Sequence, residues 1–325
     1  MSTRTALLKL LSDNKGSFVS GQQIGEQLNV SRNAIWKAVA QLKNDGYDIE
    51  SKSSAGYCLK GGDNLLTLDA VMADVHVPCN VKVFDTVTST NDLAKESELS
   101  ERPLAIIANK QSRGRGRLGR AFESPGGTGL YMTIAFKPTF DLDKSLYVTM
   151  AAAVATCRAV EKVCGVHTKI KWVNDVFYRK RKVCGILTEA QSNFETGKID
   201  SLIIGTGINC FPGSFPEELR NIAGSISDEQ DSFSRNRLAA ELINETMAAL
   251  DDLNEKRFLT EYKRRCMILG KQIVIHPNYN DEGIKAMAID IDDDGGLVVN
   301  YLQGPKNGMM ETLHTGEISI SMDPY

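Results

Sequence analysis

The hydrophobic pattern of residues 1–46 predicts three helices in succession. Leucines recur at helical spacing over residues 7–11, and a lysine-glycine pair then ends the first segment. Ser20 and Gln23 form a capping-box pair at the start of the second segment. Ser31 is predicted to cap the third segment. Its apolar side chains fall at i, i+4 and i+7, namely Ile35, Val39 and Leu42. Two such helices joined by a tight turn form the helix-turn-helix pattern.

A short hairpin is predicted directly after these helices, with strands at 48–51 and 57–60. This order is typical of a winged helix-turn-helix, in which the hairpin lies beside the third helix. The outer face of that helix carries side chains suited to phosphates and base edges, namely Arg32, Asn33, Lys37 and Gln41. Residues 1–60 also hold eight Lys/Arg against five Asp/Glu. DNA binding is expected, and a protein-interaction module with a solvated basic face is the alternative.

The central part of the chain combines apolar strands with one long helix. Residues 146–163 show helical apolar spacing, and the alanine-rich stretch 151–155 suits close packing on a sheet. A hairpin is predicted around a basic turn at 179–182. Strand-like segments lie at 104–108, 169–178, 183–189 and 202–205.

The last part of the chain changes to short strands separated by turn clusters. Four strands are predicted, at 272–276, 284–291, 297–301 and 317–321. They suggest a small SH3-like β-barrel. The acidic turn at 292–296 lacks the spacing of a calcium-binding loop, so a solvated hairpin turn is preferred to a calcium site. The predicted class is α+β, with domains at 1–62, 63–268 and 269–325 and a linker over 61–64.

The amino-acid composition excludes several classes of function. The 325 residues carry 38 Lys+Arg and 41 Asp+Glu, a net charge of -3, which excludes a uniformly basic nucleic-acid coat. The 42% of hydrophobic residues suffices for globular cores, and no apolar run is long enough to span a bilayer. Seven scattered cysteines form no C-x-x-C pair, so reduced thiols and no structural metal site are expected. These features predict a cytoplasmic protein without a membrane partner.

A glycine-rich basic loop follows the predicted strand at 104–108. It carries five cations and no acid, namely Lys110, Arg113, Arg115, Arg117 and Arg120. Residues 114–119 match G-x-G-x-x-G, but Pro125 and its neighbouring glycines prevent the helix that a dinucleotide site needs. Arginines with alternating glycines instead predict a phosphate-binding loop that orders around an anion. A flexible nucleic-acid-binding segment of RGG type is the alternative.

Further polar clusters lie at 171–175, 181–182 and 205–209. Each alone has an ordinary structural explanation, such as a core tryptophan, a solvated turn or a side-chain-capped turn. The chain has no Walker A motif, no G-x-S-x-G elbow and no H-E-x-x-H motif. No covalent protein nucleophile is therefore indicated.

Together these motifs resemble the bifunctional biotin protein ligases that also repress the biotin operon. The resemblance extends over essentially the whole chain. It is carried by Ser89-Thr90-Asn91, the loop from Gln111 to Arg120, Lys171-Trp172-Val173-Asn174-Asp175, Arg181-Lys182-x-x-Gly185-Ile186-Leu187 and Gly205-x-Gly207-Ile208-Asn209. Val173 stands where many members have proline, Leu118 is apolar within the basic loop, and Phe122 stands where tryptophan is common.

The resemblance implies a central mixed-sheet α/β catalytic domain of the biotin/lipoate ligase type. It implies catalytic roles for Lys182, Arg117 and Arg115. It implies that biotin is bound by Ser89, Thr90, Asn91, Gln111, Arg115, Gly116, Arg117, Lys182 and Gly185. It implies that ATP is bound by Gly114, Arg117, Arg120, Phe122, Asn174, Asp175 and Asn209, with Mg²⁺ arriving with ATP near Asp175.

The implied activity is ATP-dependent activation of biotin to biotinyl-5′-AMP and transfer to a lysine of a biotin carboxyl carrier domain. The acceptor would belong to acetyl-CoA carboxylase or another biotin-dependent enzyme. The resemblance further implies that the adenylate promotes homodimerisation and operator binding, which would couple two sites through one association equilibrium. A non-catalytic biotin-sensing transcription factor and a lipoate-type protein ligase are the alternatives.

Overall fold

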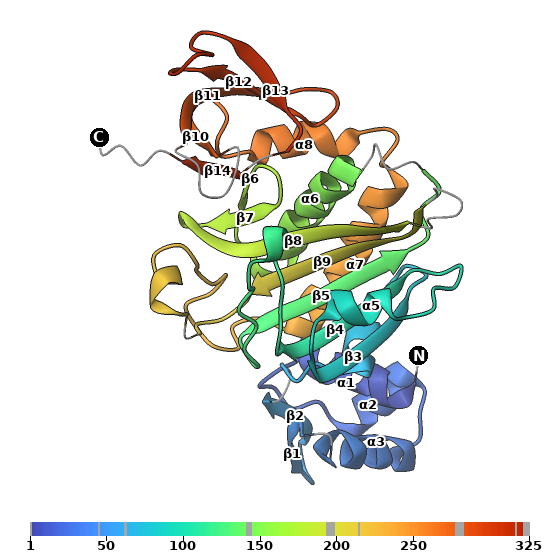
Figure 1. Cartoon of the computed structure of the whole chain (residues 1–325). Helices are drawn as coiled ribbons and strands as arrows, with labels where there is room; N and C mark the ends of the chain where they lie inside the picture. Colours follow the sequence, from blue (N-terminus) through green and yellow to red (C-terminus); the bar gives the residue numbers. More distant parts are fainter. Residues whose placement is uncertain are drawn as a thin grey trace.

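The structure is a computed structural model that describes residues 2–44, 46–61, 64–140, 145–192, 199–213, 215–276, 283–315 and 317–320. Three parts follow one another along the chain: a small helical domain, a central sheet with flanking helices, and a C-terminal sheet at the opposite end (Figure 1). Within the described residues, no helix is both long and apolar enough to cross a membrane.

The N-terminal part is the predicted winged helix-turn-helix. Its elements are α1 (Thr3–Asp13), α2 (Gly21–Leu28), α3 (Arg32–Asn44), β1 (Asp48–Lys52) and β2 (Gly56–Gly61). The capping box of Ser20 and Gln23 is present in both directions and starts α2 as predicted. Ile35, Val39 and Leu42 are buried in a core shared by the three helices and the hairpin.

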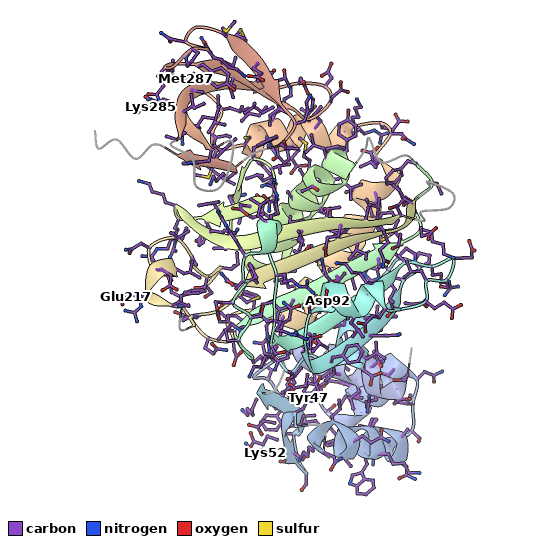
Figure 2. All side chains as sticks on the ribbon, in the orientation of Figure 1. Tyr47, Lys52, Asp92, Glu217, Lys285 and Met287 are labelled. Carbon is purple, nitrogen blue, oxygen red and sulfur yellow. The ribbon has the colours of Figure 1, made fainter. Side chains whose placement is uncertain are left out.

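The N-terminal domain is attached to the central domain by polar contacts. Thr5 donates a hydrogen bond of 2.9 Å to Asp69, which lies on α4 (Leu68–Met72), and Lys9 forms an ion pair with Asp74. Figure 2 shows Tyr47 facing the central domain and Lys52 on the far side of the wing. Of the predicted linker 61–64, Gly62 and Asp63 lie outside the described residues.

A mixed seven-stranded sheet forms the centre of the molecule, in the order β3-β4-β5-β9-β8-β7-β6. β3 and β4 are parallel and the other neighbours are antiparallel. The strands are β3 (Asn80–Val87), β4 (Leu104–Gln111), β5 (Gly129–Phe136), β6 (Lys169–Lys171), β7 (Asp175–Tyr178), β8 (Arg181–Ser192) and β9 (Ile199–Asn209).

The two faces of this sheet are covered differently. α6 (Ser145–Cys164) and α7 (Arg235–Asp251) pack on one face, where the small side chains 151–155 are buried as the sequence predicted (Figure 1). The short helix α5 (Thr90–Lys95) covers part of the other face. The face with fewer helices is left available for a ligand.

The predicted basic turn at 179–182 needs a correction. β7 ends at Tyr178, and only Arg179 and Lys180 form the turn, both with positive φ (47° and 65°). A two-residue turn of this kind matches the twist of an antiparallel hairpin. Lys182 therefore belongs to β8, where the sheet fixes its backbone.

The C-terminal part is a five-stranded antiparallel sheet, in the order β13-β12-β11-β10-β14. It follows α8 (Arg257–Arg265). Its strands are β10 (Gln272–His276), β11 (Ile284–Ile291), β12 (Leu297–Tyr301), β13 (Met310–Leu313) and β14 (Glu317–Ile320). The sequence predicted all of these except β13. Among the described residues β13 and β14 are not paired, so the sheet does not form a closed barrel.

The acidic turn at 292–296 is only partly solvated, in contrast to the prediction. Asp293 and Asp294 are exposed, whereas Gly295 and Gly296 are buried. The Trp172 indole donates a hydrogen bond of 3.1 Å to the Gly295 carbonyl. The turn therefore fixes the C-terminal sheet to the central domain beside the cavity described next.

Candidate active site

A cavity of about 420 Å³ opens on the face of the central sheet that carries α5. This volume lies within the range of small-molecule sites. Five cationic side chains line the cavity, namely Arg115, Arg117, Arg120, Lys171 and Lys182. Two carboxylates, Glu123 and Asp175, also line it. The excess of cations suits an anionic ligand.

One end of the cavity is a network of buried neutral groups at the start of α5. Ser89 caps this helix, accepting from Asp92 N, and is 3% exposed. Thr90 donates from its backbone N and its hydroxyl to Gln111 Oε1, at 2.8 and 3.1 Å. The Gln111 amide in turn donates to Ser124 at 3.0 Å. Fixed donors and acceptors of this kind recognise a polar neutral ligand group.

Two further residues outside the cavity lining hold Asn91 in place, and the sequence analysis missed both. Thr133 on β5 donates a hydrogen bond of 2.6 Å to Asn91 Oδ1. The Asn91 amide donates to Glu189 on β8 at 2.8 Å, and Lys95 forms an ion pair of 2.7 Å with the other oxygen of Glu189. Neither Thr133 nor Glu189 belongs to a recognisable motif, because only the packing of α5 on the sheet brings them to Asn91.

The basic loop arches over the cavity. Its backbone folds back on itself, with Gly116 N donating to Arg120 O at 2.8 Å and Phe122 N donating to Gly114 O at 2.9 Å. The tip is the 3₁₀ turn η1 (Arg117–Gly119). That this loop orders around an anion stays a prediction. Its backbone hydrogen bonds define its path, and acceptors from other elements face two of its arginines.

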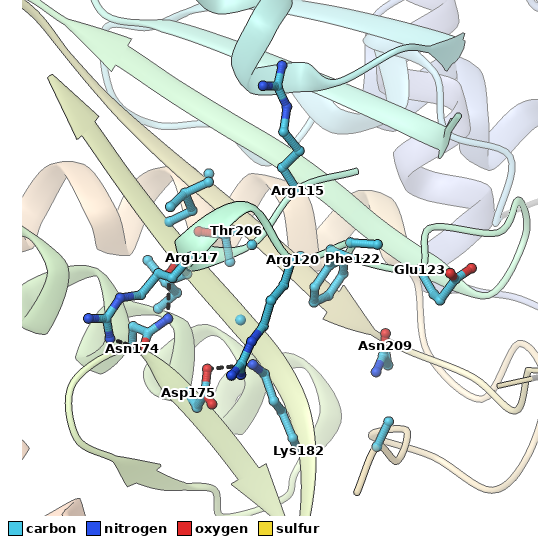
Figure 3. A pocket seen from close by; sticks show the side chains of 18 of the residues that line it. Arg115, Arg117, Arg120, Phe122, Glu123, Asn174, Asp175, Lys182, Thr206 and Asn209 are labelled. Carbon is cyan, nitrogen blue, oxygen red and sulfur yellow. Dashed lines mark hydrogen bonds and ion pairs between the residues drawn. The ribbon is translucent and has the colours of Figure 1, made fainter. Parts of the chain in front are cut away.

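Those two arginines point in different directions from the loop (Figure 3). Arg115 pairs with Asp92 of α5, and this carboxylate raises the pKa of the guanidinium. Arg117 instead donates to Asn174 Oδ1 at 3.1 Å. The loop therefore joins α5 at one end to the β6–β7 connection at the other.

Lys182 lies at the second end of the cavity, facing Asp175 across the β7–β8 hairpin (Figure 3). Its ammonium nitrogen is 2.6 Å from Asp175 Oδ1. That oxygen makes no aligned hydrogen bond, so the contact is an ion pair. Both side chains are partly buried, at 30% and 20% exposure. The sheet thus holds a cation at a fixed place on the cavity wall.

The G-x-G motif of β9 has a direct steric explanation. Residues two apart on a strand face the same side, and here Gly205 faces Asn91 while Gly207 faces Phe122. A Cβ atom on Gly205 would lie 2.2 Å from Asn91 Oδ1. A Cβ atom on Gly207 would lie 2.5 Å from the Phe122 ring. The two glycines therefore allow both side chains to lie directly against the strand.

The remaining wall is apolar and comes from segments that the sequence analysis did not connect with the site. Phe215, Leu219 and Ile222 line it from the segment around η3 (Glu217–Leu219). Ile318 lines it from the C-terminal sheet. Asn209 is held near this wall by a hydrogen bond of 3.1 Å to Gly224 O. No motif marks these apolar residues, because their proximity depends on the path of a long connection.

The structure brings together all the predicted ligand residues except one. Every predicted biotin and ATP residue lines the cavity apart from Gly114, which is buried in the base of the loop. The predicted DNA residues lie far from it along the chain, exposed on α3: Arg32, Asn33, Lys37 and Gln41. Burial raises the pKa of Cys184, which lies on β8 beside the cavity, and a buried neutral thiol is inert.

Comparison with known proteins identifies the parts. Residues 3–58 match a helix-turn-helix domain family, and residues 83–209 match the biotin/lipoate A/B protein ligase family. The chain is 35% identical to the bifunctional ligase/repressor BirA of Bacillus subtilis, over 69% of this chain and 70% of that protein. It is 30% identical to the bifunctional ligase/repressor BirA of Escherichia coli, over 98% of each chain.

A solved structure agrees with these matches. The biotin protein ligase from Aquifex aeolicus, in complex with biotin and ATP, superposes with a TM-score of 0.62 and 25% identity. The match covers 74% of this chain and 97% of that one. The two BirA proteins are 30–35% identical to this chain and cover 69% and 98% of its length. The chain therefore belongs to the biotin/lipoate A/B protein ligase family, among the bifunctional ligase/repressors with an N-terminal helix-turn-helix domain.

Proposed function

We infer that this chain is an ATP-dependent biotin protein ligase and a biotin-responsive transcriptional repressor. The observation that carries the enzymatic part is a cavity in which one basic loop joins a neutral hydrogen-bonding end to a cationic end. A biotin sensor needs the first end only. The second end, with Arg117 and Lys182, suits the phosphate chemistry of a ligase.

The first step joins two anions. A biotin carboxylate oxygen attacks the α-phosphorus of ATP, and the bond from that phosphorus to the pyrophosphate oxygen breaks. Biotinyl-5′-AMP and pyrophosphate are the products. Because no protein nucleophile is needed, the chain contributes positioning and charge neutralisation. Lys182 and Arg117, which line the cavity, would offset the negative charge on the oxygens of the α-phosphate.

The ligand roles divide along the cavity. Ser89, Thr90, Asn91 and Gln111 would hold biotin, with Gly185 and Gly116 near its carboxyl end. Arg120, Phe122, Asn174 and Asn209 would contact the nucleotide, with Gly114 supporting the loop from behind. The buried network around Asn91 supports the biotin end, because it offers fixed polar partners to an uncharged ring.

The residues present also fit Mg²⁺ bound together with ATP. Mg²⁺ commonly takes one or two carboxylates and completes its shell with water and substrate phosphates. Within the described residues no group of three or more potential metal ligands forms a cage. Asp175, paired with Lys182 in the cavity, is the carboxylate that would hold the ion, and the ion would neutralise the leaving pyrophosphate.

In the second step the amine of an acceptor lysine attacks the acyl carbon, and the bond to AMP breaks. The acceptor would be a biotin carboxyl carrier domain of acetyl-CoA carboxylase or of another biotin-dependent enzyme. The mixed anhydride is exposed to hydrolysis before transfer. The loop over residues 114–122 covers the cavity and would shield the anhydride from water.

The regulatory part rests on the N-terminal domain. Arg32, Asn33, Lys37 and Gln41 would contact operator DNA from α3. Biotinyl-5′-AMP would promote homodimerisation, so that the intermediate serves as corepressor. We also assign the chain to the cytoplasm, its C-terminal sheet to an SH3-like fold, and its domains to 1–62, 63–268 and 269–325.

One labelling experiment tests the enzyme against its alternatives. The chain is incubated with ATP, Mg²⁺, labelled biotin and a carrier domain, with unlabelled lipoate as competitor. Labelling of the carrier that lipoate does not reduce is the expected result. Binding of biotin without any labelling would leave only a sensor. Loss of label to lipoate would indicate a lipoate-type ligase, which the same family includes.

The coupling to DNA has its own test. Operator affinity and sedimentation are measured with and without biotin and ATP. Tighter DNA binding and a shift from monomer to dimer are expected when both ligands are present. Equal DNA affinity in all conditions would contradict the proposed corepressor role.

A further inference from the structure

The chain has two tryptophans, and their environments are opposite. Trp172 is 4% exposed and donates its indole hydrogen to Gly295. Trp36 is 62% exposed and lies on α3. An indole is the largest apolar side-chain surface a protein carries, and leaving it in water forfeits the stabilisation that burial would give. Trp36 is therefore the exposed tryptophan, and it lies on the helix to which we assign DNA binding.

The position of Trp36 on α3 places it on the outward face. Ala38 and Val39 on the inner face are buried in the domain core, as are Ile35 and Leu42. Trp36 is one turn from Arg32, at i+4, and adjoins Lys37, and both are exposed. α3 lies on the side of its domain away from the central sheet (Figure 1). The indole is therefore in the middle of the surface that this helix presents to solvent.

The charges around this surface suit a nucleic acid better than a second copy of the chain. α3 contains no acidic residue between Arg32 and Asn44. On the neighbouring wing, Lys52 and Lys60 lie over the ring of Phe18, at 4.5 and 5.5 Å from its centre. Two copies that met through α3 would bring like charges together, which is unfavourable. Duplex DNA offers phosphates to these cations and base edges to the helix.

The chemistry of the indole limits which groups of the DNA bases Trp36 can recognise. An indole has one donor and no acceptor, and most of its surface is apolar. In the major groove the apolar group on the base edges is the thymine C5 methyl, whereas the other features are hydrogen-bonding atoms. We propose that Trp36 packs on a thymine methyl in the operator and is a specificity-determining residue of the repressor. This proposal rests on the proposed DNA-binding function.

Selection of DNA sequences tests the role of Trp36 in specificity. The wild-type chain, with biotin and ATP, selects duplexes from a randomised library, and Trp36→Ala and Trp36→Phe are put through the same selection. We expect Trp36→Ala to lose preference at one or two base pairs that include a thymine. Its affinity for the wild-type duplex should fall roughly tenfold, the typical cost of one wrong base pair. Trp36→Phe should retain part of the preference.

Removal of the methyl group itself gives the decisive comparison. Thymines of the selected duplex are replaced one at a time by deoxyuridine, which lacks the C5 methyl. At one position wild-type affinity should fall about fourfold, the equivalent of one buried methyl group. Trp36→Ala should be insensitive to the same replacement. Equal sensitivity of both proteins at every thymine would overturn the methyl contact.

Three controls separate the possible failures. Biotin transfer and the far-UV circular dichroism spectrum of Trp36→Ala should equal those of the wild type, which shows that the central domain is active and that the N-terminal helices are formed. Met310→Ala removes a side chain that is 64% exposed on β13, in the C-terminal sheet, and should leave DNA selection unchanged. If the wild type selects no duplex, the repressor function fails. If it selects a duplex that Trp36→Ala binds equally well, only the role of Trp36 fails.

Discussion

Lys182→Met is the most informative single substitution in the active site. It removes the ammonium that lies 2.6 Å from Asp175 and keeps an unbranched side chain of similar length. If Lys182 stabilises charge at the α-phosphorus, its loss resembles that of one oxyanion donor, about 10²–10³-fold in rate. The free Asp175 carboxylate would add repulsion toward ATP, so the larger figure is expected. Folding should be little affected, because the ion pair is partly exposed.

The assay for Lys182→Met is biotin-dependent pyrophosphate release, measured in a single turnover so that product release does not mask the chemical step. Lys180→Met is the matched control, because Lys180 lies in the same hairpin but is exposed and outside the cavity lining. It should retain the wild-type rate. A rate for Lys182→Met within about threefold of the wild type would contradict an electrostatic role, since one donor is worth far more.

Three other predictions concern fit and stability. Gly207→Ala places a Cβ 2.5 Å from the Phe122 ring and should strongly lower the rate of adenylation. In a Phe122→Ala background the same substitution should lower the rate only slightly further, and a double-mutant cycle measures this non-additivity. Arg265→Met should destabilise the chain by about 3–5 kcal/mol in urea unfolding, because Arg265 is 8% exposed and pairs with Glu161 and Glu261 at 2.7 Å each. Arg265, with a smaller contribution from His167, lowers the pKa of Glu161 to about 2 from 4.5. The resulting stability is present above pH 4.5 and is lost as the pH falls toward 2, so the wild type should lose at most about 3 kcal/mol over that window and Arg265→Met markedly less.

Local signals made the N-terminal domain and most C-terminal strands predictable. The capping pair of Ser20 and Gln23 and the spacing from Ile35 to Leu42 specify helix starts and buried faces without help from distant residues. β13 was not predicted, because none of its four side chains is buried and no apolar alternation marks it, whereas Ile318 and Ile320 alternate with polar residues in β14. The turn predicted at 179–182 was too long, because a run of basic residues gives no signal for the position at which the second strand of the hairpin begins.

The site was predictable only where residues belong to motifs. Asn91, Arg117 and Lys182 lie in recognisable segments, and all three line one cavity. Thr133 and Glu189 hydrogen-bond Asn91 because α5 packs on the sheet, and Ile318 lines the cavity from β14. Such contacts depend on tertiary packing between residues far apart in the sequence, so no local sequence pattern predicts them.

A crystal structure with biotinyl-5′-AMP bound tests the central claim most directly, because that claim concerns the position of two cations relative to one phosphate. We predict that Lys182 Nζ and the Arg117 guanidinium each lie about 2.7–2.9 Å from an oxygen of the adenylate, with the biotin ring against Asn91. Arg117 kept on Asn174 and Lys182 kept on Asp175, with the phosphate contacting neither, would contradict the account.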